Sequence, residues 1–423
     1  MIGHQKGVVL AGAFGNALEW YDFTIYAFFV PVIATLFFPA KTLFLSILAT
    51  FGVFAIGFLV RPLGGILFGY IGDHIGRKKA LILSMIMMSV PTCLIGLLPT
   101  YHAIGIAAPL MLIVLRIIQG LAVSGELTTA TVFLIEHADV DRRGIAGSLA
   151  MTGALVGIVL SSIVASVVTE MVSDSHLTTW GWRIPFVLGG VIGMIGLRVR
   201  MKSIEPMMYE ESKKTTLKKG TRPSVIHHMT SLDYKTIFVG ICLTSIMAIA
   251  NYFLIGYFNT FLVESQGLPL RAVTVINSIA MTLQMILTVM MGRLSDKVGR
   301  KRVLGSGIVG LAVLAYPVFW LLLQHDIYKA LIGETLFAMA TAAICGLIPT
   351  TLAEMFDTHH RNSGISMSYN VALAAFGGTA PLVAITLVAS TQNPFAPAWY
   401  LIVCAVIAFS ALLTLDESYK KSL

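Results

Sequence analysis

The chain has 423 residues, of which 57% are hydrophobic and only 12% are charged. Soluble domains carry about twice that charged fraction, and a mean hydropathy of +0.84 excludes a water-soluble globule. The formal net charge is +8. Because the basic residues occupy short connections between apolar runs, this charge indicates membrane orientation, and we expect no nucleic-acid partner.

The apolar runs predict twelve membrane-spanning helices. A helix needs about 20 apolar residues to cross a bilayer, and these runs have that length without the alternation of barrel strands. The fold class is therefore an all-α membrane protein. The predicted spans are 8–38, 43–70, 81–98, 108–136, 145–170, 183–201, 236–262, 272–293, 302–323, 329–355, 362–390 and 397–415.

Lysine and arginine are distributed unequally between the two sets of connections. Cytoplasmic loops of membrane proteins are enriched in both residues, so the richer set predicts a multi-pass protein of the cell (inner) membrane with both termini cytoplasmic. The opposite connections carry only Lys41, Arg183, Arg271 and Lys329. The richer set comprises Arg77, Lys78, Lys79, Arg142, Arg143, Lys297, Arg300, Lys301, Arg302 and Arg361, with nine more from Arg198 to Lys235.

The segment 202–235 is the only long polar connection, and we interpret it as a cytoplasmic linker. It separates an N-terminal six-helix bundle, 1–201, from a C-terminal one, 236–423. The two halves repeat each other, which is typical of transporters with a substrate site between the halves. The motif Gly69-x-x-x-Asp73-x-x-Gly76-Arg77-Lys78-Lys79 follows the second predicted span, and Gly292-x-x-x-Asp296-x-x-Gly299-Arg300-Lys301-Arg302 follows the eighth. A second repeat has the same spacing in both halves. Its residues are Glu136, Asp139 and Arg143 after the fourth span and Glu354, Asp357 and Arg361 after the tenth.

The doubled loop motif resembles the signature of the major facilitator superfamily, and further motifs resemble its metabolite:proton symporter family. Within that family the chain looks most like the proline/betaine and citrate transporters. The motif in the fourth predicted span differs from the usual family sequence, because it is Ser124-Gly125-Glu126-Leu127. The other motifs are Gly15-Asn16-Ala17-Leu18-Glu19-Trp20-Tyr21-Asp22-Phe23, Arg61-Pro62-Leu63-Gly64-Gly65, Arg116-Ile117-Ile118-Gln119-Gly120, Gly181-Trp182-Arg183-Ile184-Pro185-Phe186, Ser368-Tyr369-Asn370 and Phe376-Gly377-Gly378-Thr379-Ala380-Pro381.

The loop motif predicts a gating latch on the cytoplasmic side. Asp73 can cap the N-terminus of a neighbouring helix, where the helix dipole favours a carboxylate. Arg77 can then reach Glu136, and the resemblance implies that such a charge relay stabilises the outward-open state. The second half repeats the latch with Asp296, Arg300 and Glu354. The alternative is that the basic loops serve orientation alone, which does not explain an aspartate at the same place twice.

Ionisable residues inside the membrane are costly and are candidates for function. We predict that Arg116 binds a substrate carboxylate, because its planar fork suits that group. A structural salt bridge from Arg116 to helix 1 is the alternative. We predict that Glu126 or Asp22 carries a coupling proton, with Glu19 beside Asp22 on helix 1. For the helix 1 acids, helix-packing polarity remains the alternative.

Neutral polar residues complete the predicted substrate site. Hydroxyls and amides suit a polar head group that needs hydrogen bonds without a second charge. Hydrogen bonding between helices explains each of them equally well. The predicted set consists of Tyr26, Gln119, Asn251, Tyr257, Tyr369 and Asn370.

These features predict a proton-coupled symporter that imports a small carboxylate-bearing metabolite by alternating access. A proton-coupled exporter on the same fold is the alternative, and a receptor on a transporter scaffold is a further one. A membrane enzyme would need a cluster of catalytic or metal-ligating residues, and the sequence contains none, so no metal is expected. We expect no cofactor beyond the coupling ion, a proton or a sodium ion, and a monomer whose partners are the bilayer and its small-molecule substrate.

Overall fold

The computed structural model describes residues 2–74, 77–122, 126–202, 233–357, 360–417 and 419, and every regular element among them is helical. The predicted linker 202–235 lies almost wholly outside these residues. The first half contains α1 (Ile2–Phe28), α2 (Val30–Phe37), α3 (Leu43–Leu59), α4 (Arg61–His74), α5 (Arg77–Leu97), α6 (Tyr101–Ile104), α7 (Ala107–Ala122), α8 (Glu126–Glu136), η1 (Val140–Arg142), α9 (Arg143–Met171), α10 (Asp174–His176), η2 (Leu177–Gly181) and α11 (Arg183–Lys202).

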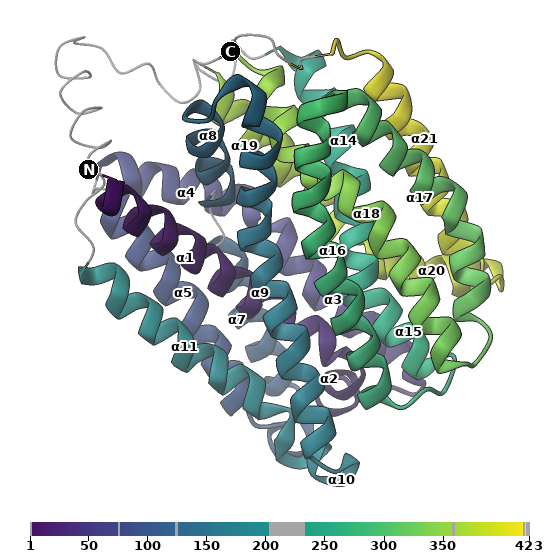
Figure 1. The fold of residues 1–423 in the computed structure, drawn as a ribbon. Helices are drawn as coiled ribbons and strands as arrows, with labels where there is room; N and C mark the ends of the chain where they lie inside the picture. Colours follow the sequence, from purple (N-terminus) through teal and green to yellow (C-terminus); the bar gives the residue numbers. More distant parts are fainter. Residues whose placement is uncertain are drawn as a thin grey trace.

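The second half begins at α14. Its elements are α14 (Tyr234–Tyr252), η3 (Phe253–Tyr257), α15 (Phe258–Glu264), α16 (Leu270–Val298), α17 (Arg300–Leu322), α18 (Ile327–Met355), α19 (Arg361–Ala372), η4 (Leu373–Gly377), α20 (Ala380–Thr391) and α21 (Ala396–Leu413). Figure 1 shows the halves side by side, in purple to teal and in teal to yellow, with both chain termini at the same end of the bundle.

The helices confirm the twelve predicted spans. Within the described part of the chain, eight helices are long and apolar enough to cross a membrane, and two bent helix pairs pass the same test when each pair is taken as one span. Two shorter apolar helices, Ile82–Leu97 and Ala107–Ala122, occupy the predicted third and fourth spans. The fold class predicted from the sequence is therefore correct.

Prolines and π-helical turns interrupt several of the spans. The chain bends by 65° between α1 and α2, where Pro31 occupies the first turn of α2 and lacks the donor that would continue the helix. The seventh predicted span consists of α14, η3 and α15 and is called helix 7. The π-helical turn η3 interrupts it around Gly256. A second one, η4, precedes Pro381 at the start of α20. By contrast, Pro349 lies inside α18 without ending it.

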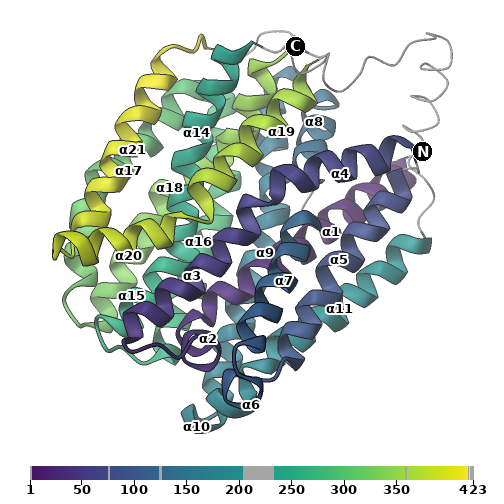
Figure 2. The same ribbon diagram turned by 180° about the vertical axis from the view of Figure 1, so that it is seen from behind.

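The seam between the halves is closest where α9 meets α16. A Cβ atom on Gly144 would lie 2.4 Å from the carbonyl oxygen of Gly292, so the two backbones approach as only glycine allows. Farther along the seam, Thr169 and Thr274 share a 3.0 Å hydrogen bond. Figure 2 shows α3 and α20 on the opposite side of the molecule, where they form the second seam.

The helix bundle has two ends. The latch end is the end at which α9, α17 and α19 begin, and it carries the repeated basic motifs. The far end is the one at which α9 ends and α16 begins. Pairing of Thr169, near the end of α9, with Thr274, near the start of α16, shows that these helices run antiparallel across the seam.

Candidate transport site

Arg116 lies on α7 with no exposure to solvent. Its Nη1 donates to Oε1 of Gln119 at 3.0 Å, and both terminal nitrogens reach the carbonyl oxygen of Phe23 at 3.4 Å. The guanidinium lies 3.9 Å from the centre of the Tyr26 ring and 5.5 Å from that of Phe54. Its Nε has no hydrogen-bond partner. Among the described residues its partners are thus neutral, which leaves a buried positive charge without a counter-ion.

A second buried arginine, Arg61, begins α4 and was not among the predicted site residues. Its guanidinium lies 4.0 Å from the centre of the Phe58 ring and 4.4 Å from that of Phe23. Its Nε also lacks a hydrogen-bond partner. An arginine inside an apolar run was itself a sufficient signal, although the sequence analysis treated Arg61 only as part of a family motif.

Tyrosines from the second half face these arginines across the seam. Tyr252 of α14 packs its ring against Phe58, with 4.8 Å between ring centres. Arg61 interacts electrostatically with Tyr252, with Tyr369 of α19 and with Glu19. Both tyrosine hydroxyls are buried, and that of Tyr369 has no hydrogen-bond partner, whereas that of Tyr252 faces Arg61. Polar groups from both halves therefore meet here, as expected at a site that binds a polar solute.

A chain of polar side chains connects Arg116 to Asp22. Gln119, which accepts from Arg116, donates from Nε2 to the hydroxyl of Thr92 at 2.8 Å. Asp22 lies beside the hydroxyls of Thr92 and Ser89. It is 2% exposed and packs so tightly on α11 that a Cβ atom at Gly189 would lie 2.7 Å from its Oδ1. The predicted arginine, Arg116, and one predicted proton carrier, Asp22, thus belong to one network across α1, α5 and α7.

The other predicted acids lie elsewhere. Glu19 is half-buried and near Arg61, whereas Asp22 points to α5 and α11, so the two helix 1 acids have different partners although they are three residues apart. The side chain of Glu126 lies outside the described residues. Tyr26 directs its hydroxyl to the carbonyl oxygen of Thr50 at 3.0 Å and offers its ring to Arg116.

The remaining predicted residues are separated from the arginines. Asn251 accepts from Gln284 at 2.8 Å and donates to the sulfur of Cys345 at 3.0 Å, so it joins helices within the second half. Tyr257 packs in an aromatic cluster of that half, 5.6 Å from Phe261, with a buried hydroxyl that lacks a partner. Asn370 donates to Ser366 of its own helix at 2.9 Å.

At the latch end, the three predicted latch residues of the second half meet. Arg300 contacts Asp296 at 2.8 Å and Glu354 at 3.3 Å. The carboxylate of Asp296 crosses the seam and accepts from the backbone nitrogens of Gly144 at 2.8 Å and Ile145 at 2.9 Å. These donors form the first turn of α9, where the helix dipole favours a negative charge. One carboxylate therefore links α16, α17 and α9.

Glu136 contacts an arginine that the latch prediction did not include, and its predicted contact with Arg77 stays a prediction. It forms a 2.6 Å ion pair with Arg361 of α19, and this pair also crosses the seam. The side chains of Asp73 and Arg77 lie outside the described residues. At the far end, Nδ2 of Asn259 donates to the carbonyl oxygen of Phe28 at 3.0 Å. Contacts therefore hold the halves together at both ends of the bundle.

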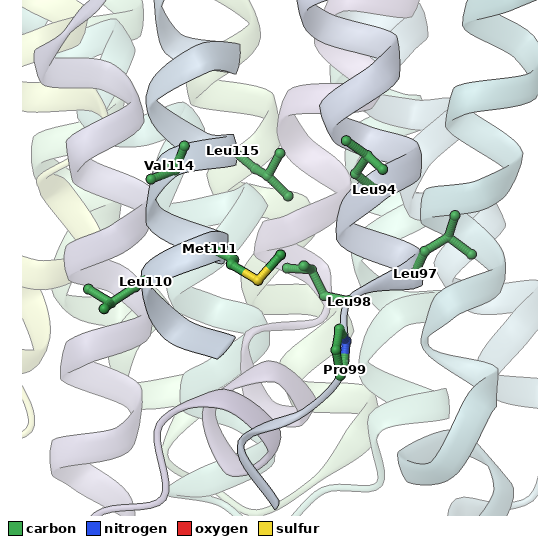
Figure 3. Close-up of a pocket in the computed structure, with 8 residues that line it drawn as sticks. All are labelled: Leu94, Leu97, Leu98, Pro99, Leu110, Met111, Val114 and Leu115. Carbon is green, nitrogen blue, oxygen red and sulfur yellow. The ribbon is translucent and has the colours of Figure 1, made fainter. Parts of the chain in front are cut away.

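A hollow of about 420 Å³ lies away from this network. Figure 3 shows its lining side chains on α5, on α7 and on the segment that follows α5. Because every lining residue is apolar, the hollow offers no side-chain hydrogen bond to a polar solute. The lining residues are Leu94, Leu97, Leu98, Pro99, Leu110, Met111, Val114 and Leu115. No group of His, Cys, Asp and Glu in the described part of the chain is arranged to hold a metal.

A buried acid in the second half was missed by the sequence analysis. Glu334 of α18 has no exposure to solvent and accepts a 2.9 Å hydrogen bond from Asn277 of α16. It lies inside a predicted span, so its position among apolar residues was the signal that could have identified it.

The predicted spans, the latch contacts of the second half and the buried polar groups between the two halves are those of a membrane transporter with the major facilitator fold. Solved structures share this fold. A D-xylose-proton symporter superposes with a TM-score of 0.77 at 19% identity, covering 99% of this chain and 100% of that one. A partially occluded inward open conformation of the xylose transporter XylE from E. coli gives 0.78 at 17% identity over 100% of both chains.

The sequence pattern of the sugar (and other) transporter family matches residues 8–423, and the chain belongs to this family. A putative proline/betaine transporter of Staphylococcus aureus (strain COL) is 35% identical over 98% of this chain and 88% of its own length. The glycine betaine/proline/ectoine/pipecolic acid transporter OusA of Dickeya dadantii is 34% identical over 100% and 85%. The proline/betaine transporter of Escherichia coli (strain K12) is 32% identical over the same shares. The chain is thus a transporter and not an enzyme.

Proposed function

We propose that the protein is a proton-coupled importer of a small carboxylate-bearing metabolite of the proline/betaine class. The observation that carries this proposal is the state of Arg116, a fully buried guanidinium whose described partners are all neutral. An unpaired buried charge is costly. A substrate carboxylate would supply the missing counter-ion and could take the unused Nε of Arg116 as well as that of Arg61.

The aromatic residues around the arginines suit the other end of such a solute. Tyr26, Phe54, Phe58 and Tyr252 pack around the two guanidinium groups, which already use the faces of the first three rings. Aromatic faces also attract quaternary and secondary ammonium groups. A zwitterion that brings its carboxylate to Arg116 fits the positive charge there, with its onium group directed away from the two guanidinium groups. The names of the relatives, which are proline and betaine transporters, support this class.

The network from Arg116 to Asp22 supports coupling to protons. Asp22 is buried next to hydroxyl groups, and a carboxylate in that position is stabilised by taking up a proton. When a substrate carboxylate binds Arg116, it competes for the guanidinium with Gln119, whose amide is hydrogen-bonded to Thr92 beside Asp22. Substrate binding and the proton occupancy of Asp22 are thereby linked, as symport requires.

The latch supplies the conformational switch of this mechanism. The basic residues at the latch end predict that it faces the cytoplasm. The Asp296–α9 and Glu136–Arg361 contacts would then close the cytoplasmic side and would break when the site opens inward. We propose a monomer in the inner membrane, with no cofactor besides the coupling proton.

Uptake into proteoliposomes tests this function. With an inward proton gradient, radiolabelled proline or glycine betaine should accumulate, and a protonophore should abolish the accumulation. A sodium gradient at constant pH should produce none. If neither zwitterion nor a panel of small organic acids enters under any inward gradient, the proposal fails. Accumulation only with an outward-directed gradient would instead support the exporter.

A further inference from the structure

Glu334 is a fully buried carboxyl group for which the proposed mechanism has no role. It lies seven residues into α18 from the far end, or about 10 Å along the helix axis. Its Oε2 accepts from Nδ2 of Asn277, while its Oε1 has no hydrogen-bond partner although it is buried. An ionised carboxylate at such a position would be held by a single hydrogen bond, which is far from enough to replace its hydration.

The amide of Asn277 has a defined orientation that leaves one oxygen unused. Its Nδ2 donates to Oε2 of Glu334 at 2.9 Å and to the carbonyl oxygen of Leu254 at 2.6 Å, so both of its hydrogens are engaged. A flipped amide would turn its oxygen toward two acceptors, because the Leu254 carbonyl cannot donate. Oδ1 of Asn277 therefore remains, buried and without a donor.

The pair consequently lacks one hydrogen. Two acceptors, Oε1 of Glu334 and Oδ1 of Asn277, are unsatisfied on side chains that are already joined by one hydrogen bond. A proton on Oε1 turns the carboxylate into an acid whose O–H can donate to Oδ1. The result is a closed acid–amide pair in which each group donates once and accepts once, and it removes the buried charge.

No described cation competes for Glu334. Among the described residues, Asn277 is the only side chain that interacts with its carboxyl group electrostatically or through a hydrogen bond. The ionisable groups in the far-end halves of α18 and of the described elements packed against it are Tyr328 and Lys329 on α18, Arg271 on α16, Tyr316 on α17, Glu170 on α9, and Tyr252, Tyr257 and Glu264 on helix 7.

A hydrogen bond from Asn277 also reaches the segment that connects the pair to the far-end contact between the halves. Leu254 belongs to η3, the π-helical turn of helix 7, and the next helix, α15, contains Asn259, whose side chain closes the far end against Phe28. A protonated Glu334 keeps Asn277 in place and thereby anchors helix 7. When the acid loses its proton to water at the far end, the charge requires hydration, which the packed position does not allow.

We propose that Glu334 is a second proton-binding site, loaded from the far end, and that its protonation allows helix 7 to close that end. The consequence for transport rests on the proposed proton coupling, but the protonation itself does not. The step is a proton transfer from a hydronium ion at the far end to Oε1 of Glu334, in which one O–H bond of the hydronium breaks, the acid O–H bond forms and a water molecule is released. A proton would thus be required for closing on the outside, before the site opens inward.

Infrared spectroscopy of the purified full-length protein tests the protonation directly. We expect a pH-sensitive carbonyl-stretch band of a protonated carboxylic acid that is lost in Glu334→Gln, kept in Asp22→Asn, and shifted in Asn277→Ser. Glu170→Gln, which removes an exposed acid near the far end of α9, is the matched control and should change nothing. An unchanged band in Glu334→Gln overturns the proposal. Should that variant not fold, an unshifted band in Asn277→Ser does so.

Cysteine labelling tests the link to closing. Thr260 is buried in α15 at the far end, so a thiol there reports on its opening. The thiolate is the form that reacts, so each labelling rate is divided by the rate of free cysteine at the same pH. With Thr260→Cys in a background without the four native cysteines, this normalised rate should rise about 10-fold as the pH rises. Adding Glu334→Gln, which mimics the protonated acid, should keep the normalised rate low at every pH. A rise in the normalised rate that persists with Glu334→Gln refutes the gating role. Loss of zwitterion binding in Arg116→Ala tests the proposed function separately.

Discussion

The two halves of the transporter use the same positions for opposite charges. Glu334 stands in the second half where Arg116 stands in the first, at the same offset along the chain that relates Glu354 to Glu136. Asn277 corresponds in the same way to Phe54, at the offset that relates Asp296 to Asp73. Arg116 stacks near the ring of Phe54 in the first half, and Glu334 binds the amide of Asn277 in the second.

The difference shows which parts of the repeat were free to diverge. The latch motif has its acid and its arginine in both halves. At the buried centre, Arg61 and its repeat equivalent Gln284 differ in charge. In the proposed mechanism, the first half offers cations to the substrate, while the second half offers neutral groups and one acid that can hold a proton.

Among these variants, Arg116→Ala should have the largest effect on substrate affinity. Removing one partner of a buried, hydrogen-bonded charge pair costs about 2–5 kcal/mol, or roughly 30-fold or more in affinity. We therefore expect undetectable binding of proline or betaine in a thermal-shift titration, with an unchanged monomer peak in size-exclusion chromatography. Arg271→Ala, which removes an exposed far-end arginine, is the control. Wild-type affinity in Arg116→Ala would remove the carboxylate site from the first half.

Asp22→Asn should separate binding from coupling. The amide keeps the shape of the protonated acid but cannot release a proton. Exchange of substrate across the membrane should therefore persist within about 2-fold, while accumulation driven by a pH gradient falls at least about 10-fold. Counterflow and gradient-driven uptake in the same proteoliposomes measure the two quantities. Undiminished accumulation would mean that the coupling proton is carried by another group, such as Glu126.

Arg61→Gln makes the first half match the second at this position. Because Arg61 does not contact Gln119 or Asp22 in the described network, its loss should weaken substrate binding without changing pH dependence. A hydrogen bond to a charged group contributes about 1.5–3 kcal/mol, so we expect an affinity loss of roughly 10- to 100-fold. Gln284→Ala should have a smaller effect on affinity. A larger loss in Gln284→Ala would place the substrate in the second half.

Asp296→Asn should give the smallest effect, on stability and latch opening. The single amide oxygen can keep only one of the two hydrogen bonds from the start of α9, and the charge that interacts with Arg300 and the helix dipole is lost. We expect a loss of about 1 kcal/mol and a thermal midpoint lower by a few degrees. The exposed Asp357→Asn is the matched control. If the thermal midpoint falls equally in both variants, the loss of stability comes from the change in net charge and not from the contacts of Asp296.

Repetition in the sequence predicted the latch better than the site. Asp296, Arg300 and Glu354 occupy repeated positions in a short motif, and the structure brings them together. Glu136 contacts Arg361, a contact that the repeat did not predict, because the seam places the start of α19 beside the end of α8. Glu19 and Asp22 lie three residues apart on one helix, yet their side chains contact different neighbouring helices. Spacing along one helix could not reveal which helices lie opposite.

By itself the sequence determined the twelve spans, their division into two repeats and the family, because long apolar runs and a doubled motif are local properties of the chain. Only the tertiary structure decided which buried polar groups meet. It placed Arg61 beside tyrosines of the other half, joined Arg116 to Asp22 through Gln119 and Thr92, and left Glu334 with Asn277 alone among the described side chains. The physical reason is that a buried charge is stabilised by neighbours on other helices, and helix packing across the seam selects those neighbours.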